Sequence, residues 1–265
     1  MTKSLPPAAG GAADGGEELA AMGLLDHLEE LRQRLIRSVV ALLLAFFVCW
    51  PFSDRIYDFL AQPIYAHLPE GTKLAFLGVT DPFMIKVKVA ALASVFLASP
   101  WVLWQVWSFV APGLYRRERR LAGPFIVFGS LLFLAGGAFA YYVAFPFAVE
   151  FLLGMGEEFQ PTITVTSYLS FLMTVILGLG LMFELPTVIF FLARLGVVTP
   201  AFLMQHFRWA VLIIFVVAAV ITPTPDVVNL CIFALPTIGL YLVGVGVAAL
   251  FGPGDRGARV DGGGE

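Results

Sequence analysis

Residues 121–149 read LAGPFIVFGSLLFLAGGAFAYYVAFPFAV and contain no acidic or basic side chain. A helix needs about 20 consecutive apolar residues to cross the hydrocarbon core of a bilayer, which is about 30 Å thick. This stretch exceeds that length and predicts a membrane-spanning helix. The whole chain agrees, because 59% of its residues are hydrophobic and 13% are charged, whereas a typical soluble domain is about 25% charged. We therefore interpret the chain as an integral membrane protein.

Five further apolar stretches flank this one. The fifth of the six is short, with about 21 Å of helix before Pro223, and Pro236 is expected to kink or shorten the sixth. The predicted spans cover residues 35–52, 89–111, 123–146, 167–192, 208–222 and 227–250. The predicted fold is an all-α bundle of six transmembrane helices within residues 22–251. The flanks 1–21 and 252–265 have the composition of disordered tails.

Positive charge is distributed unevenly between the two ends of these spans. Six spans place both termini on one side, and that side carries most of the arginines, with the densest group in RRERR at 116–120. The other side carries Arg55, Lys73, Lys86 and Lys88. Because basic residues accumulate in cytoplasmic loops, both termini are predicted to lie in the cytoplasm.

The composition disfavours several classes of function. The net charge of −3 is unlike that of a nucleic-acid-binding protein, which carries a basic patch. Two cysteines and three scattered histidines do not supply a disulfide framework or a metal cluster. The sequence has no Gly-Lys pair for a phosphate-binding loop, and no Ser-His pair or pair of aspartates inside a predicted span. We therefore expect no cofactor, no nucleic-acid partner and no enzyme activity.

Two acidic residues stand among arginines near the cytoplasmic ends of the spans. The leucines of LLDHLEELRQRL at 24–35 have helical spacing and predict an amphipathic helix that lies at the cytoplasmic surface and runs into the first span. Within it, Glu30 and Arg34 are four residues apart, which favours a solvated ion pair; the other interpretation is a carboxylate available to a cationic ligand. Glu118 is either neutralised by its neighbouring arginines or ready for an incoming guanidinium group.

Two further acids lie in or beside the later spans. Glu184 falls near the middle of the predicted fourth span, where a carboxyl group costs at least about 2.5–3.5 kcal/mol and usually has a function. Pro186 lacks an N–H group, so the carbonyl of Met182 loses its helical partner. Asp226 follows a proline-rich connection, and we interpret it as the N-cap of the last helix.

Several motifs, in this order, resemble the TatC family, whose members are the multi-spanning core subunits of the twin-arginine protein translocase. The resemblance extends over about residues 24–251. It is carried by HLEELRQRL at 27–35, Gln62-Pro63, WSFVAPGLY at 107–115, ERR at 118–120, Phe145-Pro146, SYLSF at 167–171, FELP at 183–186, Thr222-Pro223 and PDV at 225–227.

The resemblance implies a receptor for folded proteins whose signal peptides carry paired arginines. It places the peptide site on the cytoplasmic face of a bacterial inner membrane protein. The implied peptide-binding residues are Glu30, Glu118, Arg32, Arg34 and Phe109. Carboxylates suit this role because they bind guanidinium groups in a two-point geometry that lysine lacks.

The resemblance also implies how the protein assembles and works. Glu184 matches a polar position that faces a concave membrane cavity, where TatA- and TatB-type single-span partners dock. Pro63 and Asp226 match positions on which transport depends, and other copies of the chain, the lipid bilayer and the proton motive force complete the system. The sequence departs from the family after Asp226, where Asn229-Leu230 replaces a Ser-Gln or Ser-Met pair. A different interpretation is a small-solute secondary transporter that uses Glu184 as a proton or cation site.

Overall fold

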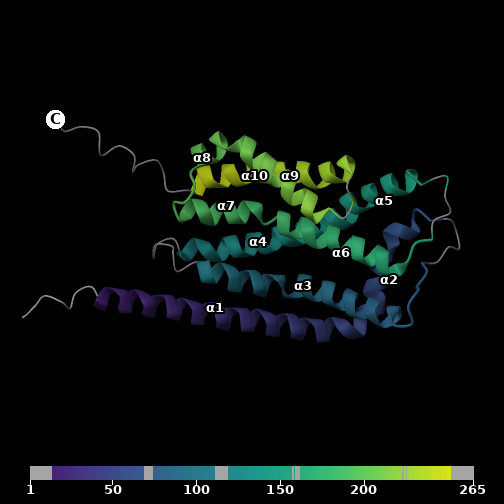
Figure 1. Ribbon diagram of the computed structural model, residues 1–265, viewed down its shortest axis with the longest axis horizontal. Helices are drawn as coiled ribbons and strands as arrows, with labels where there is room; N and C mark the ends of the chain where they lie inside the picture. Colours follow the sequence, from purple (N-terminus) through teal and green to yellow (C-terminus); the bar gives the residue numbers. More distant parts are fainter. Residues whose placement is uncertain are drawn as a thin grey trace, which may run out of the picture.

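The computed structural model describes residues 14–68, 74–110, 119–156, 158, 162–222, 224 and 226–251. Within these ranges the regular elements are helices, and one isolated bridge pairs Ala75 with Thr164. Figure 1 shows the helices lying roughly side by side along one axis. They are α1 Asp14–Cys49, η1 Trp50–Phe52, α2 Ser53–Tyr65, α3 Asp81–Val110, α4 Arg119–Phe139, the π-helical turn η3 Ala140–Ala144, α5 Phe145–Gly154, α6 Val165–Met182, α7 Leu185–Arg194, α8 Pro200–Gln205, α9 Phe207–Ile221 and α10 Val227–Phe251.

Six apolar helical segments in the described ranges confirm the predicted all-α membrane fold. Five are long enough to cross a bilayer, and Phe207–Ile221 is a shorter apolar helix of 15 residues. The expected short fifth helix is therefore present. The expectation of a short sixth helix is wrong, because α10 has 25 residues and continues through Pro236. Neighbouring helices support a proline inside a membrane helix, and α10 packs against both α7 and α9.

The first helix is longer and straighter than the sequence predicts. α1 starts at Asp14 and has 36 residues, so residues 14–21 are helical although their composition predicts a disordered tail. Segment 24–35 runs directly into the first span, as its leucine pattern predicts (Figure 1). Alanine, leucine and glutamate, which dominate residues 17–31, favour continuous helix. The remaining predicted tail residues, 1–13 and 252–265, lie outside the described residues.

The helices pack in an order that leaves α1 at one edge. α1 packs mainly on α3, α3 on α4, α4 on α6, and α7 on α10 (Figure 1). The centre is apolar and close-packed, with Phe145, Leu169, Leu172, Leu179 and Phe233 almost fully buried. Along α1, by contrast, large apolar side chains such as Leu44 and Phe47 are exposed. A helix with that surface is suited to contact with lipid.

The predicted fourth span is divided into two helices. α6 ends at Met182, and α7 begins at Leu185 with Pro186 in its first turn. Since Pro186 has no N–H group, a continuous helix would leave the Met182 carbonyl unpaired. The chain instead tightens, and the N–H group of Glu184 donates to the carbonyl of Leu181 over 3.1 Å. Glu184 therefore lies at the break.

A second proline determines how α2 is attached to the bundle. Pro63 lies inside α2, so the Phe59 carbonyl four residues earlier has no helical donor. The hydroxyl of Tyr141 donates to this carbonyl over 2.5 Å, and the hydroxyl of Tyr168 donates to the next one, that of Leu60, over 2.6 Å. Tyr141 belongs to the π-helical turn and Tyr168 to α6. The carbonyl released by Pro63 thus becomes an attachment point for α2.

We predict that Tyr141→Phe destabilises the protein by about 1–3 kcal/mol, because it leaves the Phe59 carbonyl without its donor. In a Pro63→Ala background the loss should be smaller, since that substitution restores the missing backbone N–H group. The measurement is a double-mutant cycle of detergent-solubilised protein unfolded by denaturant. Tyr142→Phe is the control, because Tyr142 is exposed. Additive effects of the Tyr141 and Pro63 substitutions would contradict this account.

Candidate functional site

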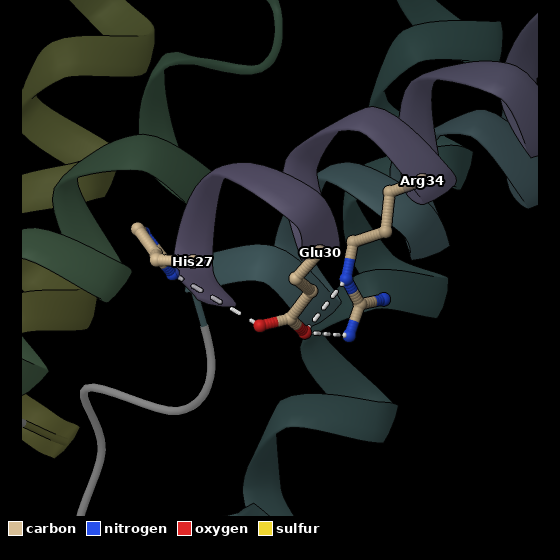
Figure 2. Close-up of polar contacts among 3 residues, drawn as sticks. All are labelled: His27, Glu30 and Arg34. Atoms are coloured by element: carbon tan, nitrogen blue, oxygen red, sulfur yellow. Dashed lines mark hydrogen bonds and ion pairs between the residues drawn. The ribbon is translucent and has the colours of Figure 1, made fainter. Parts of the chain in front are cut away.

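Glu30 of α1 is held by an arginine of the same helix. Arg34, one turn later, donates to the Oε1 atom of Glu30 from Nη2 over 2.6 Å and from Nε over 3.0 Å (Figure 2). The Glu30 side chain is 35% exposed and that of Arg34 20% exposed. The pair is therefore better shielded than a typical surface ion pair, and it fixes the orientation of the carboxylate.

Within the described residues, the second oxygen of Glu30 lies near His27 but accepts no hydrogen bond from it. The Nδ1 atom of His27 lies 4.0 Å from Oε2, beyond the 2.7–3.2 Å range of N–H···O hydrogen bonds. Oε2 has no hydrogen-bond partner among the described residues. The ring of His27 stacks on the ring of Phe109, with centroids 4.3 Å apart and an angle of 17° between planes. Phe109 lies near the end of α3, so this contact joins α3 to the carboxylate of α1.

The other sequence-predicted residues of this site lie apart from Glu30 or outside the described ranges. Arg32 pairs with Glu29 over 3.4 Å, and its side chain is 71% exposed. Glu118 belongs to residues 111–118, which lie outside the described residues. The structure thus brings together Glu30, Arg34 and Phe109, and it adds His27.

Glu184 is buried in the break between α6 and α7. It is 4% exposed, and neither of its carboxylate oxygens forms a hydrogen bond with a described residue. Gly129 of α4 leaves room for this side chain: a Cβ atom at that position would stand 2.9 Å from Oε2 of Glu184 and 3.1 Å from Oγ1 of Thr187. Glu184 also lines an apolar groove of about 270 Å³ formed with α9 and α10.

Asp226 caps α10 through two hydrogen bonds. Its Oδ1 accepts from the backbone N–H group of Asn229 over 2.7 Å, and its Oδ2 accepts from Nδ2 of the same residue over 2.8 Å. Asn229 also donates to the hydroxyl of Thr224 over 3.0 Å. Burial raises the pKa of Asp226, but hydrogen bonds from Thr224 and Asn229 outweigh it and leave the pKa below its usual value. Asn229, where the sequence departs from the family pattern, therefore fixes this acid in place.

Pro63 lies in α2, at the opposite end of the molecule from the start of α1 (Figure 1). His27, Gly129 and Tyr141 were not predicted from the sequence to have these contacts, and Asn229 was noted only as a departure from the family pattern. The position of His27 three residues before Glu30 was a usable signal, because such residues share a helix face. The contacts of Gly129 and Tyr141 depend on packing between distant segments, whereas Asn229 contacts Asp226, three residues before it.

The arrangement of these sites on a six-span helical fold agrees with the comparison with known families. The family described as Sec-independent protein translocase protein (TatC) matches residues 26–236. The chain belongs to the TatC family. It is therefore related to multi-pass membrane components of a protein translocase.

Individual TatC proteins are similar over most of the chain. The TatC protein of Koribacter versatilis is 47% identical over 92% of this chain and 91% of its own length. That of Helicobacter pylori is 42% identical over 88% of this chain and 91% of its own length. A crystal structure titled as the twin-arginine translocase receptor TatC is 35% identical, with a TM-score of 0.74, and the match covers 84% of this chain and 98% of that one. These names do not support the solute-transporter alternative.

We predict that Gly129→Ala destabilises the protein by about 1–3 kcal/mol, because the added methyl group overlaps Glu184 and Thr187. Gly123→Ala on the same helix is the matched control, since a Cβ atom there would meet nothing within 4 Å. Thermal unfolding in detergent measures both changes. Adding Glu184→Ala to Gly129→Ala should recover stability, and the absence of any recovery would contradict the assigned contact.

Proposed function

We propose that this TatC-family chain is the signal-peptide receptor of a twin-arginine translocase and that Glu30 binds one guanidinium group of the paired arginines. The observation that carries the proposal is that the two carboxylate oxygens of Glu30 have different contacts (Figure 2). Arg34 occupies Oε1, whereas Oε2 accepts no hydrogen bond within the part of the chain that the structure describes and lies 4.0 Å from Nδ1 of His27. A carboxylate oxygen held in this way is ready to accept N–H donors without a change of rotamer.

Arginine and lysine differ in how they would use this oxygen. A guanidinium group presents several N–H donors in one plane, whereas the ammonium group of lysine is a compact, strongly hydrated charge. Glu118 is proposed to supply the second carboxylate, and Arg32 to remain near the entrance with its charge balanced by Glu29. The solved relative is titled a receptor, which supports the same role for this chain.

The other acidic positions suit assembly rather than peptide recognition. We propose that the groove beside Glu184 receives the helices of TatA- and TatB-type single-span partners, and that further copies of the chain join the complex. Pro63 and Asp226 each fix a connection on the far side from Glu30, through Tyr141 and Asn229 respectively. In this arrangement the protein binds and assembles and does not catalyse a reaction.

The distribution of basic residues supports one orientation of the chain in the membrane. We propose a bacterial cytoplasmic (inner) membrane location with both termini in the cytoplasm, since basic residues dominate that side. Glu30 would then face the cytoplasm, where folded cargo is made. The proton motive force would supply the energy for export.

We predict that Glu30→Gln weakens binding of a signal peptide with paired arginines by about tenfold or more, because a charge-assisted hydrogen bond contributes about 1.5–3 kcal/mol. The measurement is fluorescence anisotropy of a labelled peptide titrated with the full chain in lipid nanodiscs. The matched control is Glu29→Gln, since Glu29 is the adjacent acid and pairs with Arg32. It should change the dissociation constant less than about twofold.

A peptide with paired lysines gives the second comparison. It should bind the unmodified chain more weakly than the arginine peptide does, and Glu30→Gln should narrow the difference. Equal effects of Glu29→Gln and Glu30→Gln would remove Glu30 from the role proposed here.

A further inference from the structure

His27 lies beside Oε2 of Glu30, which accepts no hydrogen bond from a described residue. Figure 2 shows the carboxylate of Glu30 between His27 on one side and Arg34 on the other. The distance of 4.0 Å from Nδ1 to Oε2 is too long for a direct hydrogen bond. A ligand that donates to Oε2 would therefore lie next to the His27 ring.

The ring of His27 has one face packed on Phe109, and about half of the side chain is exposed. Its packed face lies on Phe109, nearly parallel at 17° and 4.3 Å between centroids. The side chain is nonetheless 51% exposed. Since Phe109 comes from α3, the ring is supported from a second helix and its plane is fixed. His27 and Phe109 thus form a small aromatic platform beside an acceptor oxygen.

This combination matches the chemistry of a guanidinium group. Such a group donates hydrogen bonds from its edge while its flat face stacks on an aromatic ring. The ammonium group of lysine has no plane to stack. An aromatic platform beside Oε2 therefore favours arginine, whereas the charge of Glu30 attracts both residues.

We propose that His27, supported by Phe109, is a specificity-determining residue that selects arginine over lysine at Glu30. The inference rests on the proposed function, because it takes Glu30 as the acceptor of the arginine side chain. It assigns attraction of positive charge to Glu30 and discrimination between the two basic side chains to His27.

The test compares His27→Phe, which keeps a flat ring, with His27→Leu, which keeps apolar volume and removes the plane. Dissociation constants for the paired-arginine and paired-lysine peptides are measured with the full chain in nanodiscs. We expect His27→Leu to reduce the preference for arginine by about two- to fivefold, through weaker binding of the arginine peptide. His27→Phe should retain the preference.

The ratio of the two dissociation constants separates this role from a structural one. If His27 only holds α1 against α3, His27→Leu will weaken both peptides equally and leave the ratio unchanged, which would overturn the proposal. A loss of preference in His27→Phe as large as in His27→Leu would also overturn it. A misfolded fraction lowers the concentration of active protein equally for both peptides, so partial misfolding of a variant does not affect the ratio.

Two further variants complete the experiment. His206→Leu is the matched control, because His206, directly after α8, also packs against a phenylalanine, Phe202, with centroids 4.2 Å apart and the rings tilted by 31°; it should leave the ratio unchanged. Glu30→Gln tests the proposed function separately. If Glu30→Gln has no effect on the binding of either peptide, the proposed function fails. If Glu30→Gln weakens binding of the arginine peptide as expected but His27→Leu leaves the ratio of dissociation constants unchanged, only the proposed role of His27 is rejected.

Discussion

In hydrocarbon a backbone carbonyl without a hydrogen-bond donor is costly. Two prolines each remove such a donor, and the fold of this TatC-family chain depends on how the affected carbonyls are satisfied or avoided. Pro63 releases the carbonyl of Phe59, and Tyr141 supplies a hydroxyl from another part of the bundle. Pro186 would release the carbonyl of Met182, and there the helix ends. The first solution ties α2 to the core, and the second leaves Glu184 at a break in the middle of a span.

The two candidate sites have opposite physical character. Glu30 is partly exposed, paired with Arg34 and turned toward His27 of the same helix, whose ring stacks on Phe109 of α3, so its charge remains available to a ligand from water. Glu184 is enclosed beside Gly129 and opens onto an apolar groove. In the proposed function, charge recognition takes place at the edge of the molecule, at α1 and α3. Contacts with apolar partner helices take place on the other side, at α7, α9 and α10.

Hydropathy and proline positions predicted most of the fold, because both act locally along the chain. They indicated the six spans, the short α9 and the backbone hydrogen bond lost at Pro186, but not the division of the fourth span into α6 and α7. They were wrong about α10, where packing against α7 and α9 supports helix on both sides of Pro236. The contacts of His27 with Phe109 and of Glu184 with Gly129 could not be predicted, because they depend on how each helix is rotated against a neighbour that is distant in sequence.

The unbroken course of α1 has a mechanical consequence. Its 36 residues form a rod about 54 Å long, well beyond the hydrocarbon thickness of about 30 Å. A rod without a hinge does not absorb a displacement along its length. In the proposed function, a force exerted on Glu30 by a bound peptide along the helix axis would be transmitted to the far end of α1, directly before Trp50, whose ring lies 5.9 Å from that of Phe83 of α3 between centroids. In this way α1 is a stiff mechanical connection between the two sides of the bilayer.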